Sequence, residues 1–216
     1  MWTEFKNFLN KNFGIELNDE KISRFKKYLN EILVCSKRFN LTKIKDTKEI
    51  LYLHFADSLA GSVFLRNSIL KGQNISVIDI GSGAGFPGIP LKIVFPEIEI
   101  FLIESNKKKY LFLDYVKNQL KLKNTEIICD RAEEISKNVR FKNRFDFALL
   151  RAVKKFPDGL FLTEPFLKKE GMSLFWTTEL QENKKIILDD YFKYTLPGLE
   201  KERYILAARL ISHKKQ

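Results

Sequence analysis

The chain has 216 residues, of which 44% are hydrophobic, and this size suits one α/β domain with a modest extension rather than two independent domains. Lysine and arginine total 38 against 27 acidic residues, so the net charge of +11 favours nucleic acid as a partner, with a merely solvated basic surface as the alternative. Two distant cysteines argue against a disulfide framework and a metal site, and the lack of a long apolar run predicts a cytoplasmic protein without a membrane span.

The first part of the chain has the pattern of amphipathic helices. From Asp19 to Phe39 apolar residues recur at spacings of three and four, and Asn18 is the expected N-cap. A second helix is predicted from about Thr47 to Phe64, where no proline interrupts the pattern. We therefore predict a helical extension over residues 1–70, packed on a main domain over residues 71–216.

Strands and helices alternate in the main domain. A β-branched run at residues 75–80 ends in a glycine cluster, and two extended runs near the end of the chain are typical of a terminal hairpin. The alternation predicts an α/β fold with a mostly parallel sheet. The further strands are expected near Ile98–Ile103, Thr125–Cys129, Phe145–Leu150 and Met172–Trp176, the helices near Pro90 and over Lys107–Leu120, Arg131–Ile135 and Pro157–Lys168, and the hairpin over Lys185–Leu196 and Glu202–Ser212.

The glycine cluster is the most informative segment. It reads VIDIGSGAGFPGIP and contains Asp79, Gly81, Gly83 and Gly85 between a buried strand and a helix. Glycines let the backbone approach a ligand closely, and open parallel sheets bind ligands outside the carboxyl ends of their strands, where the strand order reverses. We therefore expect the ligand pocket at Gly81.

Two acidic residues indicate the kind of ligand. Glu104 ends the next strand, about twenty residues after the glycines, where a carboxylate accepts hydrogen bonds from ribose hydroxyls. Asp79 stands two positions before Gly81, where it favours a cationic, amine-bearing ligand and would repel a pyrophosphate. Together they favour S-adenosylmethionine, which carries a ribose, a sulfonium and an ammonium.

Other interpretations of the loop stay open. Gly83, Gly85 and Gly88 match the dinucleotide fingerprint G-x-G-x-x-G, which favours an NAD(P)-dependent oxidoreductase with a Rossmann fold. A loop with a structural role only, and a noncatalytic RNA-binding protein of the same fold, are further alternatives.

A third segment, CDRAEE, follows the third strand of the main domain. Ala132 and Glu133 are placed to bracket an adenine through backbone amides and through a carboxylate that accepts from the exocyclic amine. The alternative is a helix N-terminus that the acidic residues stabilise.

These residues resemble the bacterial ribosomal small-subunit guanine-N7 methyltransferase family, RsmG or GidB. The resemblance spans most of the chain, and the glycine-rich stretch with its FPGIP continuation is its most specific part. It is carried by RFNLTKI near Asn40, HFADS from His54 to Ser58, DIGSGAGFPGIPL from Asp79 to Leu91, DRAEE at Arg131, and FDFALLRAV ending at Val153.

The resemblance implies a Rossmann-like class I methyltransferase with a seven-stranded, mostly parallel sheet and an antiparallel C-terminal hairpin. It also implies methylation of N7 of one guanine in the decoding region (the 530 loop) of 16S rRNA, with S-adenosylmethionine as cofactor and without a metal. The expected partner is 16S rRNA or the small ribosomal subunit, and the expected state is a monomer.

The family's motifs also imply cofactor contacts. Gly81 and Phe86 in the glycine loop, Ala132 and Glu133 after the third strand, and Arg151 after the fourth are expected to contact S-adenosylmethionine. The fifth strand instead ends in FWTTE, where the family more usually has lysine and glycine, so we expect a different local shape beside the substrate pocket.

The sequence lacks the groups that other methyl acceptors require. No Pro-Pro-aromatic motif, which is typical of enzymes that methylate exocyclic amines, occurs in the chain, and neither cysteine is placed as an attacking thiolate. Guanine N7 presents an unprotonated lone pair, so no general base is needed and no catalytic residue is assigned. Arg151 is expected to position a phosphate or the carboxylate of the cofactor, with a structural ion pair as the alternative.

His54, Asp57 and Ser58 share one face of the second predicted helix because they are three and four residues apart. A serine-hydrolase triad is not implied, since neither a nucleophile elbow nor an oxyanion hole accompanies them. We expect a hydrogen-bonded cluster that fixes the helical extension to the sheet, with a role facing the substrate as the alternative.

Basic residues in the extension are candidates for following an RNA backbone. The aromatic residues among them lie on the apolar helical face, so they are expected in the core rather than as stacking platforms. The basic residues are Lys21, Arg24, Lys26, Lys27, Lys37, Arg38, Lys43, Lys45 and Lys48, and the aromatic ones are Phe25, Tyr28 and Phe39.

Overall fold

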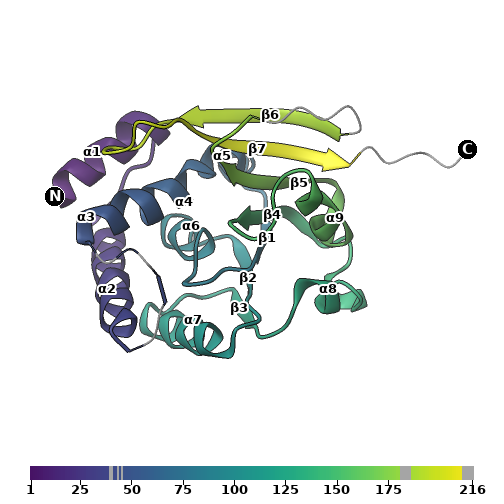
Figure 1. The fold of residues 1–216 in the computed structure, drawn as a ribbon, viewed down its shortest axis with the longest axis horizontal. Coiled ribbons are helices and arrows are strands. Elements are labelled where there is room, and N and C mark those ends of the chain that lie inside the picture. The colour runs from purple at the N-terminus through teal and green to yellow at the C-terminus, as the bar shows by residue number, and fades with distance from the viewer. Residues whose placement is uncertain (39–40, 43, 45, 181–185, 211–216) are drawn as a thin grey trace, which may run out of the picture.

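A seven-stranded sheet runs through the molecule, with helices on both of its faces (Figure 1). The computed structural model describes residues 1–38, 41–42, 44, 46–180 and 186–210. The strands are β1 (Ser76–Ile80), β2 (Glu99–Ile103), β3 (Thr125–Ile128), β4 (Phe145–Arg151), β5 (Leu167–Thr177), β6 (Ile186–Tyr194) and β7 (Arg203–Leu210).

The strand order is β3-β2-β1-β4-β5-β7-β6. Strands β1 to β5 are parallel, whereas β7 lies antiparallel between β5 and β6. The predicted α/β class, with a seven-stranded sheet and an antiparallel C-terminal pair, is thus confirmed. The chain order reverses between β1 and β4, and this switch point is where the loop after β1 begins.

Helices α6 to α9 connect the first five strands, and the other helices precede β1. Asn18 caps the second helix as predicted, because its side chain accepts a hydrogen bond from the backbone N–H of Lys21 at 2.9 Å. The helices are α1 (Trp2–Phe13), α2 (Asp19–Ser36), α3 (Thr47–Glu49), a π-helical segment (Ile50–Ala56), α4 (Asp57–Ala60), α5 (Ser62–Leu70), α6 (Gly88–Val94), α7 (Lys107–Gln119), α8 (Ala132–Ile135) and α9 (Asp158–Thr163), with 3₁₀ turns at Val139–Phe141 and Glu164–Phe166.

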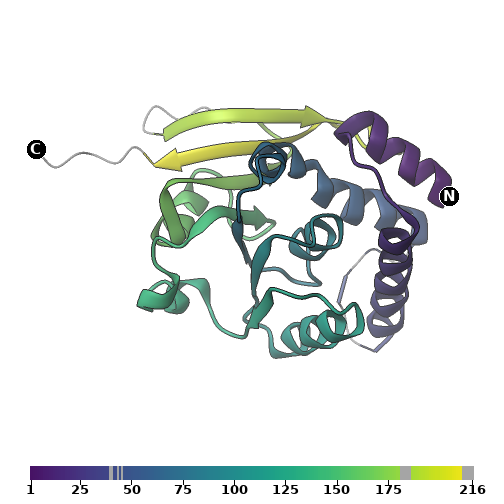
Figure 2. The ribbon, with the colours of Figure 1, turned by 180° about the vertical axis from the view of Figure 1, so that it is seen from behind.

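The two faces of the sheet build two hydrophobic cores, because successive strand residues point to opposite sides. Val77 belongs to the larger core, which holds residues of α1, α2, α5, α6 and α7. Its neighbour Ile78 belongs to the smaller core, which holds residues of α8 and α9. Figures 1 and 2 show these two groups of helices on opposite sides of the sheet. The helical extension therefore shares a core with the sheet.

The structure differs from the predicted elements in several places. Helix α1 was not predicted, although Phe5, Leu9 and Phe13 follow a four-residue spacing and are buried. The helix predicted from Thr47 to Phe64 is interrupted at Gly61, where a Cβ atom would lie 2.6 Å from the ring of Trp176. Close packing of the indole on the backbone is therefore possible only at a glycine.

Other predicted boundaries are shifted. The helix predicted to reach Lys168 ends earlier, because β5 begins at Leu167 and not near Met172. The predicted ends at Phe39, Lys185 and Ser212 lie outside the described residues.

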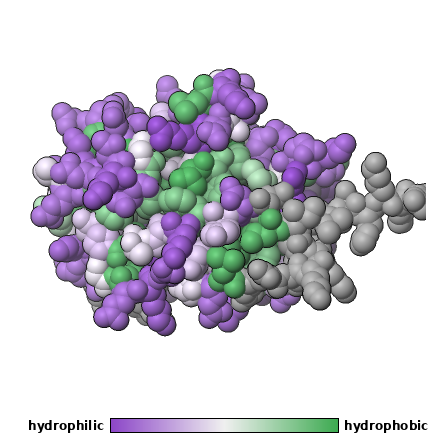
Figure 3. Space-filling view, turned by 90° about the horizontal axis from the view of Figure 1, so that it is seen from above, coloured by the Kyte–Doolittle hydropathy of each residue, from purple (hydrophilic) through white to green (hydrophobic). Residues whose placement is uncertain are grey.

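The surface seen from above is largely hydrophilic, with hydrophobic side chains gathered toward its middle (Figure 3). Of the helices that the structure describes, none combines the length and the apolar character needed to cross a membrane.

Candidate active site

The loop after β1 adopts a conformation that requires glycine. Gly81, Gly83 and Gly85 have φ angles of +70°, +61° and +100°. A Cβ atom at Gly85 would lie 2.4 Å from Ile89 Cδ1 and 2.7 Å from the hydroxyl oxygen of Tyr28, so no larger residue fits there. At Gly83 the nearest atom to such a Cβ is 3.9 Å away, so the loop is open on this side. The predicted close approach of a ligand is sterically possible at Gly83.

A cavity of about 500 Å³ lies in front of this loop. It is bounded by residues of the glycine loop, the helical extension, α7 and the ends of β4, β5 and β7. Four of the seven residues predicted to contact the cofactor line it: Gly81, Gly83, Phe86 and Arg151.

A second cavity, of about 240 Å³, lies on the other side of Gly81 and is lined by the predicted residues Ala132 and Glu133. Gly81 lines both cavities, and a Cβ atom at Gly81 would lie 2.5 Å from Val153 Cγ2. Val153 therefore packs against the loop where the two cavities meet. Val153 is not among the predicted site residues, because its position depends on how the loop after β4 folds back.

Glu104 lies behind the glycine loop and lines neither cavity. Its carboxylate accepts hydrogen bonds from the backbone N–H of Gly83 at 2.9 Å and of Asn106 at 2.7 Å. In this structure Glu104 thus holds the loop, while its contact with a ribose stays a prediction. Each carboxylate oxygen can accept more than one hydrogen bond, so the two roles are compatible.

Asp79 is fully buried beneath the loop. Its Oδ2 accepts from the backbone N–H of Gly88 at 2.9 Å, which fixes the start of α6, while its Oδ1 has no hydrogen-bond partner among the described residues. Burial raises the pKa of Asp79 to about 7, against the lowering effect of the hydrogen bond from Gly88. A positive charge in the cavity would favour the ionised form of this carboxyl group.

Arg151 is held by the helical extension. Its Nε lies 2.8 Å from Oδ2 of the buried Asp57, and its Nη2 donates to the carbonyl oxygen of Leu53. Its guanidinium also lies over the ring of Phe86, 5.7 Å from the ring centroid. The structural ion pair weighed for Arg151 is therefore present, and Arg151 lines the larger cavity as well.

Asp57 joins the helical extension to four strands of the sheet, β4, β5, β6 and β7. Its carboxylate forms an ion pair with Arg151 and accepts hydrogen bonds from Arg203 and, at 2.6 Å, from the hydroxyl group of Tyr194. Its backbone carbonyl accepts from Trp176 Nε1 at 2.7 Å. The predicted cluster that fixes the extension to the sheet is thus present, with Asp57 at its centre.

His54 faces the larger cavity but is not part of a catalytic triad. Its ring stacks on Phe86 with a centroid distance of 4.4 Å, and its Nε2 lies 2.8 Å from Thr42 Oγ1. Burial, together with the positive charge of Arg151, lowers the pKa of His54 to about 3, so the ring is uncharged at neutral pH. Ser58 donates to the backbone carbonyl of His54, as expected within a helix.

The aromatic residues of the extension belong to the core, as predicted. Phe25 and Tyr28 are fully buried, and the Tyr28 hydroxyl donates to the carbonyl oxygen of Ala84, which ties α2 to the glycine loop. None of the basic residues predicted to follow RNA appears among those that line the two cavities. Asn40, Phe39, Lys43 and Lys45 lie outside the described residues.

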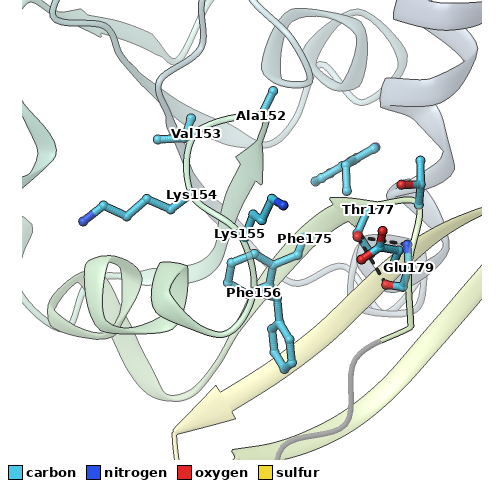
Figure 4. A pocket seen from close by; sticks show the side chains of 10 residues that line it. Ala152, Val153, Lys154, Lys155, Phe156, Phe175, Thr177 and Glu179 are labelled. Carbon is cyan, nitrogen blue, oxygen red and sulfur yellow. Dashed lines mark hydrogen bonds between the residues drawn. The ribbon is translucent and has the colours of Figure 1, made fainter.

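A third cavity, of about 360 Å³, adjoins the larger one at the FWTTE segment (Figure 4). The two cavities share Ala152, Lys155, Trp176, Thr177 and Thr178 as lining residues. The segment at which the sequence departs from the resembled family thus lies beside the larger cavity, and its different local shape stays a prediction.

The strand order, with the antiparallel β7 inserted between β5 and β6 and a glycine loop at the switch point, defines a class I methyltransferase fold. Solved structures of low sequence identity share this fold. TrmN from Thermus thermophilus matches with a TM-score of 0.51 and 14% identity, over 74% of this chain and 53% of that chain. A hypothetical protein, also from Thermus thermophilus, matches with a TM-score of 0.54 and 13% identity, over 70% of this chain and 85% of that chain.

The family model described as rRNA small subunit methyltransferase G matches residues 21–207. Proteins named ribosomal RNA small subunit methyltransferase G are 35% identical in Oceanobacillus iheyensis, over 94% of this chain and 87% of the relative, and 34% in Acetivibrio thermocellus, over 91% and 84%. One from Leuconostoc citreum is 39% identical over 74% of this chain, which spans 66% of that relative. The chain belongs to the rRNA small subunit methyltransferase G family.

Family membership confirms the enzyme class predicted from the sequence, and with it S-adenosylmethionine as the methyl donor. The dinucleotide oxidoreductase and the noncatalytic RNA-binding protein are not favoured. The position of Asp79 is consistent with this outcome, because its charge lies directly beneath the loop that a pyrophosphate would approach.

Proposed function

We propose that this chain transfers the methyl group of S-adenosylmethionine to N7 of a guanine in the decoding region of 16S rRNA, as a cytoplasmic monomer acting on the rRNA or the small ribosomal subunit. One observation carries the proposal: an open glycine loop at the switch point, with two cavities on either side of Gly81 and the buried Asp79 beneath it. We also propose that residues 1–70 form a helical extension of a methyltransferase domain over residues 71–216.

The residues present suit a sulfonium nucleoside. Gly83 leaves room for a ligand, and Asp79 has an oxygen, Oδ1, without a partner in the described part of the chain. The negative charge of Asp79 would stabilise a cationic ligand in the larger cavity. Buried carboxylates without an opposite charge are costly, so a cationic ligand also offsets the penalty of ionising Asp79.

The cofactor contacts are proposed on both sides of the loop. Ala132 and Glu133 would hold the adenine in the smaller cavity, with the carboxylate accepting from the exocyclic amine. In the larger cavity Arg151 already uses Nε and Nη2, while Nη1 has no hydrogen-bond partner among the described residues. This nitrogen would donate to the carboxylate of the cofactor.

The chemistry requires alignment rather than proton removal. When bound, S-adenosylmethionine supplies an electrophilic methyl carbon on its sulfonium sulfur. The N7 lone pair of guanine is unprotonated at neutral pH, so no residue has to accept a proton before the transfer. The low pKa of His54, about 3, leaves it uncharged, so it does not repel the cofactor or the guanine as positive charge develops there.

The mouth of the site is basic. Lys109 and Lys155 line the larger cavity, and Arg131 and Lys154 line the smaller one. We propose that Lys109, Arg131 and Lys154 contact phosphates of the RNA that flank the target base. These residues lie nearer to the site than the basic residues of the extension, which the sequence had suggested as RNA contacts.

Methyl transfer with labelled cofactor tests the proposal. Small ribosomal subunits from cells that lack this enzyme activity would be incubated with the chain and methyl-labelled S-adenosylmethionine, and the labelled nucleoside would be identified after complete digestion. We expect 7-methylguanosine at one site of 16S rRNA. Label in another nucleoside would contradict the proposed acceptor, and binding of the cofactor without transfer would favour a noncatalytic protein.

A thermal shift separates the cofactors. We expect S-adenosylmethionine at a hundredfold excess over its Kd to raise the free energy of unfolding by about 2.7 kcal/mol. NAD and NADP are expected to have no effect, because Asp79 lies beneath the glycine loop. Stabilisation by the dinucleotides alone would contradict the proposed cofactor site.

A further inference from the structure

The third cavity has opposite charges on its two sides. Lys155 belongs to the loop after β4, and Glu179 follows the end of β5 (Figure 4). Both side chains are exposed, and neither forms an ion pair with any residue that the structure describes. Because the cation and the anion line one cavity and do not pair with each other, a ligand in the cavity can interact with both.

The backbone at Glu179 is held in place. The hydroxyl group of Thr177 lies 3.2 Å from both the backbone nitrogen and the carbonyl oxygen of Glu179, so it accepts from the first and donates to the second. Figure 4 shows these two hydrogen bonds at the side of the cavity opposite Lys155. The backbone that carries the Glu179 side chain is therefore fixed at the edge of the cavity.

Aromatic residues form part of the remaining wall, beside the polar side chains of Lys154, Thr177 and Thr178. The rings of Phe156 and Phe175 are buried and line the cavity, as does the largely buried Trp176. A cavity of about 360 Å³ that combines aromatic side chains with several polar groups has the character of a site for a small planar ligand. A base that has been turned out of an RNA loop is such a ligand.

Lys155 and Glu179 match the Watson–Crick edge of guanine. That edge presents the O6 acceptor beside two donors, the N1–H and the N2 amine. A lysine ammonium can only donate and a carboxylate can only accept, so Lys155 suits O6 and Glu179 suits the two donors. Adenine presents an amine where guanine has O6 and an unprotonated N1, so both contacts would become repulsive.

We propose that the third cavity receives the target guanine, with Glu179 accepting from its N1–H and N2 amine and Lys155 donating to O6. This inference rests on the proposed function and names two specificity-determining residues for it. N7 lies on the other edge of the base, so it faces the larger cavity, which shares Ala152 and Thr177 with this one. The carboxylate of Glu179 also stabilises the positive charge that the base acquires on methylation.

A base substitution combined with a variant tests this arrangement. The substrate is the small subunit reconstituted with 16S rRNA that carries either guanine or hypoxanthine at the target position; hypoxanthine lacks only the N2 amine. For the unaltered enzyme we expect hypoxanthine to lower kcat/KM about tenfold to a hundredfold, the usual discrimination of a paired base contact. For Glu179→Ala we expect guanine and hypoxanthine to react at the same rate. This rate should lie at or below that of the unaltered enzyme with hypoxanthine, because the variant also loses the contact with N1–H.

Two controls make the result specific. Glu16→Gln alters an exposed carboxylate of the extension that lines none of the three cavities, and should leave both rates unchanged. The Kd of Glu179→Ala for S-adenosylmethionine should change by less than about twofold, because Glu179 lines neither proposed cofactor cavity.

The outcomes separate the inference from the proposed function. If the unaltered enzyme methylates N7 but Glu179→Ala keeps the full hypoxanthine penalty, Glu179 does not contact the base and the inference fails alone. If the unaltered enzyme transfers no methyl group to guanine N7, the proposed function fails and the inference fails with it.

Discussion

At the scale of single residues, Gly83 is the most direct probe of the cofactor site. Its φ of +61° is accessible to aspartate and asparagine at modest cost, and a Cβ atom there meets no protein atom closer than 3.9 Å. A side chain at this position therefore enters the space in front of the loop without a steric clash, at the modest cost of the left-handed backbone conformation.

We predict that Gly83→Asp abolishes binding of S-adenosylmethionine while the chain stays folded, because the carboxylate occupies the space of the ligand. Isothermal titration gives the Kd, and circular dichroism gives the fold. Gly72→Asp is the matched control, since Gly72 has a φ of +71° and a Cβ atom added there would have no atom within 4 Å. Unchanged affinity in Gly83→Asp would place the ligand elsewhere.

Asp79 is predicted to make stability depend on pH. Its pKa is about 7 in the folded protein and 3.8 as the reference for the unfolded chain, so the folded protein holds the proton more tightly. The free energy of unfolding therefore falls as the pH rises from about 4 to about 7, by on the order of 1 kcal/mol per pH unit, and this contribution is constant above that range.

The variant Asp79→Asn isolates this effect. The measured quantity is the difference between the free energies of unfolding of the variant and of the unaltered chain. This difference should rise with pH up to about 7, because only the unaltered chain has to ionise the buried carboxyl group. Urea unfolding at a series of pH values measures the difference. A difference that does not change with pH would show that Asp79 is ionised throughout.

At the scale of elements, the contact between the helical extension and the sheet depends on Asp57. Its side chain is fully buried, while those of its partners Arg151 and Arg203 are 14% and 20% exposed. Removing one partner of a buried, hydrogen-bonded ion pair is costly, because the other charges stay buried without compensation.

We predict that Asp57→Ala lowers the free energy of unfolding by about 3–5 kcal/mol and the Tm by roughly 10 °C. Glu126→Gln is the control, because Glu126 and Arg140 form an ion pair whose side chains are 37% and 52% exposed, and such pairs contribute about 0–1 kcal/mol. Equal losses in the two variants would mean that Asp57 has no special structural role.

Local patterns were sufficient to predict most elements, but not their tertiary partners. The glycine loop and the strands around it follow from residues adjacent in sequence, so the position of Gly81 was predicted correctly. Asp57 and Arg203 are 146 residues apart, and no periodicity links them. Helix α1 was not predicted, although Phe5 and Leu9 are buried.

The residues proposed to contact the cofactor show the same limit. Gly81, Gly83, Phe86 and Arg151 were predicted and line one cavity. Val153 was not, because its contact with Gly81 exists only once the loop after β4 lies over the loop after β1. Motifs identify residues near the ends of strands, whereas contacts between loops require the three-dimensional structure.

At the scale of the whole molecule, the net charge of +11 should make binding to RNA depend on salt. If Lys109, Arg131 and Lys154 each contact one phosphate, affinity should fall roughly twentyfold between about 50 mM and about 200 mM salt. Lys154→Gln should reduce the slope of log Kd against log salt by about 0.7, whereas Lys11→Gln on α1 should not change it. Equal slopes for the unaltered chain and Lys154→Gln would exclude the proposed phosphate contact of Lys154.

The most direct test is a crystal structure with S-adenosylhomocysteine, the demethylated product, bound. We expect the amino-acid part in front of Gly83 beside Arg151, and the adenine between Ala132 and the loop that carries Val153. An empty space at Gly81, with the ligand bound elsewhere or not at all, would contradict the account.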